Sequence, residues 1–67
     1  MLHKEIHRLP LVLEPQPEGG YVVTCPILPE LITEGDTEQE ALQNANEALA
    51  ALIEAAKVLK RPLEFAL

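Results

Sequence analysis

The longest regular pattern in the chain is a helical one between Glu34 and Lys60. Apolar residues recur there at the three- and four-residue spacing that places them on one side of a helix. They are Ala41, Leu42, Ala45, Ala48, Leu49, Leu52, Ile53, Ala55, Ala56 and Leu59. At about 100° per residue they fall within an arc of roughly 160°. The pattern predicts one long amphipathic helix, with an apolar face wide enough to cover a sheet.

The start of this helix carries capping residues. Thr37 is a suitable N-cap, because its hydroxyl can accept a hydrogen bond from an unpaired N–H of the first turn. Glu40 follows three residues later, where its carboxylate can reach back to the N–H of Thr37 and complete a capping box. Glu38 and Glu40 also place negative charge at the positive end of the helix dipole. The helix is therefore expected to begin at Thr37.

An alternating pattern precedes the helix and predicts strands. Apolar and other residues alternate between Glu5 and Glu14, which indicates a first strand over that range. Pro10 lies inside it and cannot donate to a ladder, so one side of the strand near Pro10 should be unpaired. A turn at 15–20, rich in Pro and Gly, leads into an antiparallel second strand at 21–25.

Two prolines three residues apart then interrupt the ladder. The segment Pro26–Glu30 is expected to form a short extended or polyproline-like loop. A short third strand at 31–34 follows and ends at Gly35. After the helix, apolar residues alternate again in the tail at 63–67, which could add a final strand. The prediction is a single α+β domain over residues 1–67: a two-layer β-β-β-α(-β) sandwich with an antiparallel sheet and one long helix.

The alternation also assigns the two faces of the sheet. The face under the helix should carry Leu9, Leu11, Leu13, Tyr21, Val23 and Cys25. The opposite face would then carry an apolar patch of Val12, Val22 and Ile32. A shift of one residue in register would exchange the two sets. Because one helix covers only one face, the second patch favours self-association.

The length and net charge of the chain limit the classes of function that it can have. A chain of 67 residues allows one thin core, which rarely yields more than about 3–5 kcal/mol, so a homodimer or higher homo-oligomer is expected. The 11 acidic residues exceed the 5 Lys and Arg, for a net charge of −6, which argues against binding a phosphate backbone and is compatible with a basic protein partner. One Cys, no signal peptide pattern and no long apolar run lead us to expect a cytoplasmic protein without a membrane segment.

Several segments in this order resemble the HicB-type antitoxin family. They are the strand Tyr21–Pro26, the Leu28-Pro29 pair, the run Glu34–Thr37, and the helix residues Glu40-Ala41-Leu42, Asn44-Ala45 and Glu47-Ala48-Leu49. The family pattern joins a Gly-Gly-aromatic strand, a Pro-x-Leu-Pro loop, a Gly-(Asp/Asn)-(Ser/Thr)-x-x-Glu-Ala helix start and an Ala-rich helix. The loop departs from the usual Pro-Asp-Leu-Pro-Gly, since Ile27 and Glu30 replace the Asp and the Gly.

The resemblance covers roughly residues 9 to 60. It implies a partial ribonuclease-H-like β-β-β-α-β fold, assembly as dimers or higher, and binding to a small basic HicA-like toxin that cleaves RNA and uses a catalytic His. Many family members carry a C-terminal helix-turn-helix or ribbon-helix-helix module for operator DNA. This sequence ends at Leu67, so direct DNA binding is not expected.

The candidate contact residues lie before and at the start of the helix. We predict partner contacts from the loop and the acidic residues after it: Pro26, Ile27, Leu28, Pro29, Glu30, Glu34 and Asp36. The alternatives are that Leu28 packs under the helix as core, and that the acids serve helix capping and solubility. Thr37 and Glu40 are assigned to capping.

No catalytic, metal or cofactor site is predicted. No acids are anchored at strand centres as a metal-dependent nuclease would need. His3 and His7 are four residues apart, but their segment resembles a strand and no third metal ligand is nearby. Cys25 fits a buried apolar side chain better than a nucleophile.

Two functional hypotheses remain. The first is a non-enzymatic antitoxin-like module that neutralises a HicA-type toxin by forming a complex with it. The alternative is an orphan homo-oligomeric domain, regulatory or structural, with no toxin partner.

Overall fold

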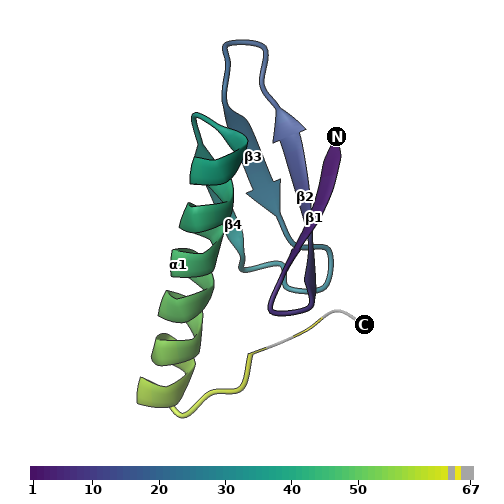
Figure 1. The fold of residues 1–67 in the computed structure, drawn as a ribbon. Helices are drawn as coiled ribbons and strands as arrows, with labels where there is room; N and C mark the ends of the chain where they lie inside the picture. The colour runs from purple at the N-terminus through teal and green to yellow at the C-terminus, as the bar shows by residue number, and fades with distance from the viewer. Residues whose placement is uncertain (64, 66–67) are drawn as a thin grey trace.

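A four-stranded antiparallel sheet and one long helix make up the computed structural model, which describes residues 1–63 and 65 (Figure 1). In chain order the elements are β1 (Leu2–Ile6), β2 (Leu9–Pro15), β3 (Tyr21–Thr24), β4 (Ile32–Gly35) and α1 (Glu38–Val58). The strands lie side by side in sequence order, and α1 packs on one face of the sheet. The two-layer α+β fold is confirmed.

The N-terminal segment differs from the single strand expected over Glu5–Glu14. It forms a hairpin in which β1 pairs with β2 through a two-residue turn at His7 and Arg8. Both turn residues have positive φ, 47° and 65°, as two-residue hairpin turns that match strand twist require. The prediction of one strand was wrong because neither turn residue is the Gly, Asn or Asp that usually marks such a turn.

Among the described residues, Pro10 lies where β2 has a neighbouring strand on one side only. It is opposite Glu5 of β1, whereas the pairing of β2 with β3 begins at Val12. The missing N–H of Pro10 therefore leaves no gap in the β2–β3 ladder. The expectation that one side of the strand is unpaired at Pro10 is confirmed.

The loop between β3 and β4 is more compact than the extended segment expected. The N–H of Leu28 donates to the carbonyl of Cys25 at 3.2 Å, and the N–H of Leu31 donates to the carbonyl of Leu28 at 2.9 Å. Two successive four-residue turns result, with Pro26 and Pro29 each in the second position. A fixed φ near −65° makes Pro favourable at that position, so the two prolines specify turns, and the polyproline-like interpretation was wrong.

The tail does not supply the fourth strand in the part of it that the structure describes. Residues 61–63 and 65 have no strand pairing. Residues 64, 66 and 67 of the expected strand lie outside the described residues. The fourth strand of the sheet is β1, from the opposite end of the chain.

The core lies between α1 and the inner face of the sheet. Its buried members are Leu11, Leu13, Val23, Cys25, Leu28, Leu31, Ala41, Ala45 and Leu49. Leu9 and Tyr21 are partly buried against them. The inner face predicted from the alternation is therefore confirmed, and the register is the one in which Leu13 pairs with Val23.

Both ends of α1 are closed by hydrogen bonds. Thr37 is the N-cap, and its Oγ1 accepts from the N–H of Glu40 at 3.1 Å. The Glu40 carboxylate accepts from the N–H of Asp36 at 3.4 Å, so the expected bond to the N–H of Thr37 was wrong by one residue. At the other end Lys60 has φ 55°, and the N–H of Arg61 donates to the carbonyl of Ala56 at 2.9 Å. This arrangement is a Schellman motif, with Lys in the left-handed position that Gly usually occupies.

The apolar face of α1 is only partly covered. Ala41, Ala45 and Leu49 are buried, whereas Ile53 is 40% exposed and Leu59 58% exposed. The second half of the helix therefore extends past the sheet, and its apolar side chains face solvent there.

Candidate functional site

The proline loop is divided between core and surface. Pro26, Pro29 and Glu30 are exposed, Ile27 is half-buried, and Leu28 is fully buried. The two turns point Leu28 into the core. Of the two interpretations that the sequence left open for Leu28, the structure shows core packing. The exposed residues of the loop remain available for contact.

The loop and the acidic helix start lie at opposite ends of β4. The loop precedes Ile32, where β4 begins, and Asp36 follows Gly35, where β4 ends (Figure 1). The predicted contact residues therefore do not form one continuous patch. Glu34 lies between the two groups, and its backbone carbonyl accepts from Nδ2 of Asn44 at 2.8 Å, which ties β4 to α1.

Acidic side chains gather around a polar depression at the helix start. The depression has a volume of about 370 Å³ and is lined by Gln16, Glu18, Gly19, Gly20, Tyr21, Glu34, Gly35, Asp36, Glu40 and Asn44. The β2–β3 turn brings Glu18 to this depression. Sequence reasoning missed Glu18, because only the strand pairing places that turn beside β4 and the helix start.

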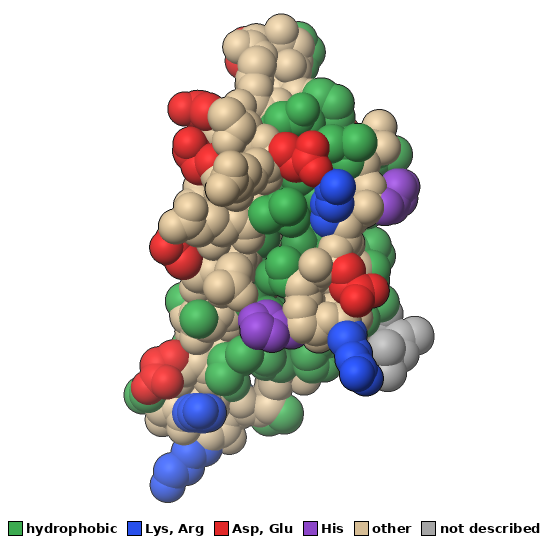
Figure 2. All heavy atoms as spheres, viewed as in Figure 1, with side chains coloured by type: hydrophobic (Ala, Val, Ile, Leu, Met, Phe, Trp, Pro, Cys, Tyr) green, Lys and Arg blue, Asp and Glu red, His purple; other side chains and the backbone are tan. Residues whose placement is uncertain are grey.

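Few of these charges are neutralised within the chain. Among residues 1–63 and 65 the only ion pair joins Nζ of Lys4 to Oε1 of Glu38 at 3.0 Å. Figure 2 shows acidic side chains along the outer side of the helix and basic side chains near its lower end. The acidic surface at the start of α1 is therefore well suited to contact with cationic groups.

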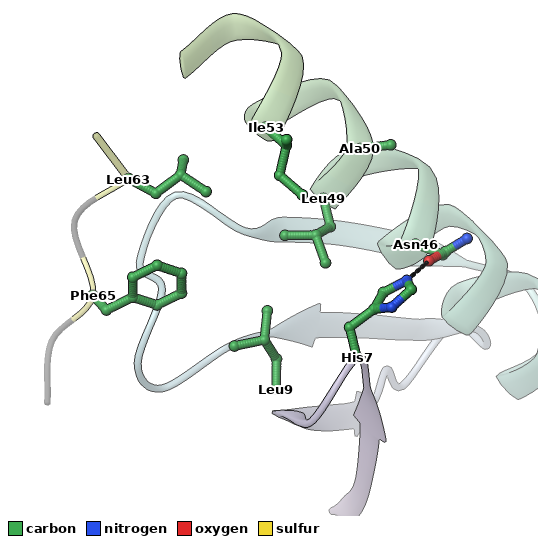
Figure 3. Close-up of a pocket in the computed structure, with 8 residues that line it drawn as sticks. All are labelled: His7, Leu9, Asn46, Leu49, Ala50, Ile53, Leu63 and Phe65. Atoms are coloured by element: carbon green, nitrogen blue, oxygen red, sulfur yellow. Dashed lines mark hydrogen bonds between the residues drawn. The ribbon is translucent and has the colours of Figure 1, made fainter. Parts of the chain in front are cut away.

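An apolar groove lies at the other end of the molecule, between the β1–β2 turn, α1 and the tail (Figure 3). It encloses about 490 Å³ and is lined by His7, Leu9, Asn46, Leu49, Ala50, Ile53, Leu63 and Phe65. At one end Nε2 of His7 donates to Oδ1 of Asn46 at 3.0 Å. The lining offers apolar contact and does not bring together a nucleophile and a base.

The remaining titratable candidates are spread over the fold. His3 is on β1 and exposed, His7 is engaged with Asn46, and Cys25 is a buried free thiol. Within the described residues no three side chains of His, Cys, Asp or Glu lie close enough together to hold a metal ion. No helix in that part of the chain is long and apolar enough to span a membrane.

Comparison with known proteins identifies relatives of two kinds. The chain is 51% identical over 47 residues to Antitoxin HicB 1 of Photorhabdus laumondii, a match that covers 70% of this chain and 30% of that protein. It is 48% identical over 42 residues to Antitoxin HicB of Escherichia coli K12, covering 63% of this chain and 30% of that protein. This chain thus matches about 30% of the length of these antitoxins.

A shorter relative matches over most of its own length. A UPF0150 protein of Thermoplasma acidophilum is 43% identical over 47 residues, which cover 70% of this chain and 68% of that protein. No family model and no solved structure matches the chain. At this identity and coverage, the chain belongs to the HicB-like family, which includes the HicB antitoxins and the UPF0150 proteins.

Proposed function

We propose that this chain is a protein-binding module that neutralises a small, basic, RNA-cleaving toxin of the HicA type by forming a complex with it. Two relatives that share about half of their matched residues with it are named as HicB antitoxins. The module acts by binding and not by catalysis. We place it in the cytoplasm, where RNA is present and the free thiol of Cys25 stays reduced.

The observation that carries the proposal is the unpaired acidic charge. The chain has 11 acidic and 5 basic residues, and in residues 1–63 and 65 one carboxylate alone, that of Glu38, is in an ion pair. An RNA-cleaving protein needs a basic surface to hold phosphates. An acidic partner attracts that surface and competes with RNA for it.

Contact residues come from both ends of β4. Pro26, Ile27, Pro29 and Glu30 contribute from the loop, while Glu34 and Asp36 contribute from the end that leads into α1. All except Ile27 are exposed. Leu28 supports the loop from beneath, because it is fully buried.

Co-expression tests the proposal. The reading frame beside this gene is expected to encode a short basic protein with one important His. Expressed together, the two proteins should co-purify, and RNA cleavage by the neighbour should fall to the level of a variant of that protein lacking its His. A neighbour that keeps cleaving RNA in the presence of excess purified chain would refute the proposed function.

A homo-oligomer is the second candidate, and the apolar groove favours it. Ile53 is 40% exposed and Phe65 42% exposed, and both side chains line the groove. Association of two copies through this end would bury these side chains. Light scattering should then show a dimer that Ile53→Lys converts to a monomer, whereas Gln43→Lys, on an exposed part of the helix away from the groove, should not.

A further inference from the structure

The sheet face that points away from α1 has no covering element among the described residues. The register fixes which side chains point there. Val12 pairs with Thr24, and Thr24 pairs with Ile32, so these three side chains form a row across β2, β3 and β4. Ile32 is 64% exposed, whereas Val12 is half-buried. The row therefore places two apolar side chains on this face, one on each side of Thr24.

A second row places carboxylates on both sides of an apolar residue. Glu14 pairs with Val22, and Val22 pairs with Glu34. Adjacent strands are about 4.8 Å apart, so the two glutamates flank Val22 at about 10 Å from each other. Glu5 on β1 faces the same way, opposite Pro10. Glu5, Glu14 and Glu34 are all exposed.

No Lys or Arg of the described strands points from this face. Lys4 is opposite Leu11, whose side chain is buried on the inner face. Lys4 therefore points to the inner face, where it forms an ion pair with Glu38 of α1. His3, opposite Val12, is the one titratable base on the outer rows. Two copies joined through this face would bring two sets of glutamates together. Like charges facing each other in this way are unfavourable, so a second copy is a poor occupant.

We infer that the outer face of the sheet is the docking surface for the basic protein partner, with Ile32 as its apolar anchor and Glu5, Glu14 and Glu34 as its charged frame. The inference rests on the proposed function and deepens it by naming the surface. Glu34 joins this face to the contact residues already proposed, and Ile32 lies two residues after Glu30, the last residue of the proline loop. The fitting partner surface carries Lys or Arg around an apolar side chain.

The two parts of the surface have different expected effects. An exposed apolar residue at the centre of an interface lowers the dissociation rate, because its burial removes apolar area from water. Carboxylates at the rim raise the association rate, and salt screens their effect. Substitutions at the two kinds of position should therefore be separable by kinetics.

The test uses the purified protein encoded beside this gene, with its important His replaced by Ala, as the probe. Its binding to the full chain is followed by biolayer interferometry at low and high salt. Ile32→Arg should weaken binding at least tenfold. The matched control is Val58→Arg, which makes a similar change at a residue of similar exposure on α1, and it should alter binding less than twofold.

A charge-matched pair tests the frame. The double variant Glu5→Gln with Glu14→Gln should slow association threefold or more at low salt, and the difference should shrink at high salt. The control, Glu47→Gln with Glu54→Gln, removes the same charge from exposed positions on α1 and should change the rate less. Circular dichroism confirms that each variant is folded.

The outcomes separate the two proposals. If the wild-type chain does not bind the probe, the proposed function fails, and this inference fails with it. If the wild type binds and both outer-face variants bind as their controls do, the docking surface is wrong while the proposed function stands. If light scattering shows a wild-type dimer that Ile32→Arg dissociates, the face joins two copies of the chain, and the basic partner is overturned as its occupant.

Discussion

Gly35 and Ala41 are packed so closely that no side chain fits at position 35. A Cβ built on Gly35 would lie 2.6 Å from the Cα of Ala41. Gly35 ends β4 and Ala41 is buried in the first turns of α1, so this contact fixes how the helix leaves the sheet. The φ of Gly35 is not positive, so its backbone conformation would accept other residues. The close contact with Ala41 alone excludes a side chain there.

The variant Gly35→Ala should therefore be destabilised. Overpacking typically costs about 1–3 kcal/mol, which is a large part of the roughly 3–5 kcal/mol expected for a core of this size. Urea unfolding followed by circular dichroism measures the change. A midpoint equal to that of the wild type would contradict the close contact.

The N-cap makes a second prediction. Thr37→Ala removes the hydroxyl that accepts from the N–H of Glu40, and it should lower the free energy of unfolding by about 1 kcal/mol. Thr37→Ser keeps an acceptor and should be nearly neutral. An equal decrease in the free energy of unfolding of the two variants would show that the hydroxyl is not the important group. Thermal unfolding of the three proteins side by side is sufficient.

Truncation should destabilise the protein far more at Leu28 than at Pro29. Leu28→Ala empties a fully buried position and should cost about 2–5 kcal/mol, enough to leave much of the chain unfolded. Pro29 is exposed, so Pro29→Ala should change stability by less than about 1 kcal/mol. The fraction folded by circular dichroism at 25 °C compares them. A folded Leu28→Ala variant of near wild-type stability would place Leu28 outside the core.

The ion pair between Lys4 and Glu38 should contribute little. Both side chains are more than a third exposed, at 45% and 38%, so solvent screens the attraction. A double-mutant cycle with Lys4→Met and Glu38→Gln should give a coupling of about 0.2–1 kcal/mol that falls in high salt. A coupling that does not change with salt would argue against a screened surface pair.

The C-terminus of α1 allows a stabilising change. Lys60 has φ 55°, in the left-handed region where a side chain is unfavourable. Lys60→Gly should raise the free energy of unfolding by roughly 0.5–1 kcal/mol, because Gly adopts this conformation without steric cost. Lys57→Gly, inside the helix, is the control and should destabilise. Chemical denaturation measures the free energy of unfolding of both variants. A lower value for Lys60→Gly than for the wild type would show that the Schellman turn is not retained in solution.

The local patterns in the sequence predicted much of the fold. The alternation of Leu9, Leu11 and Leu13 identified the inner face, because a strand with one buried face repeats every two residues. Thr37 and the apolar spacing after it identified the helix. The hairpin at His7 and Arg8 was missed, because its positive φ values are imposed by strand pairing and not by residues that favour them.

The surfaces were less predictable than the elements. Val12, Val22 and Ile32 could be assigned to one face by parity alone. The position of Glu14 and Glu34 on either side of Val22 depends on two registers, which the sequence does not specify directly. The separation of the proline loop from Asp36 likewise follows from the direction of β4, which runs away from the loop.

The inward-facing Lys4 also affects the behaviour of the protein at high concentration. In the part of the chain that the structure describes, β1 is an edge strand with one unpaired side, and such edges tend to recruit strands from other molecules. A second β1 docked antiparallel and centred on Lys4 would place two ammonium groups opposite each other, in a layer that needs apolar side chains. The ammonium group of Lys4, which Glu38 of α1 holds in place, therefore opposes edge-to-edge aggregation. Removing this charge should lower the solubility of the protein more than its stability.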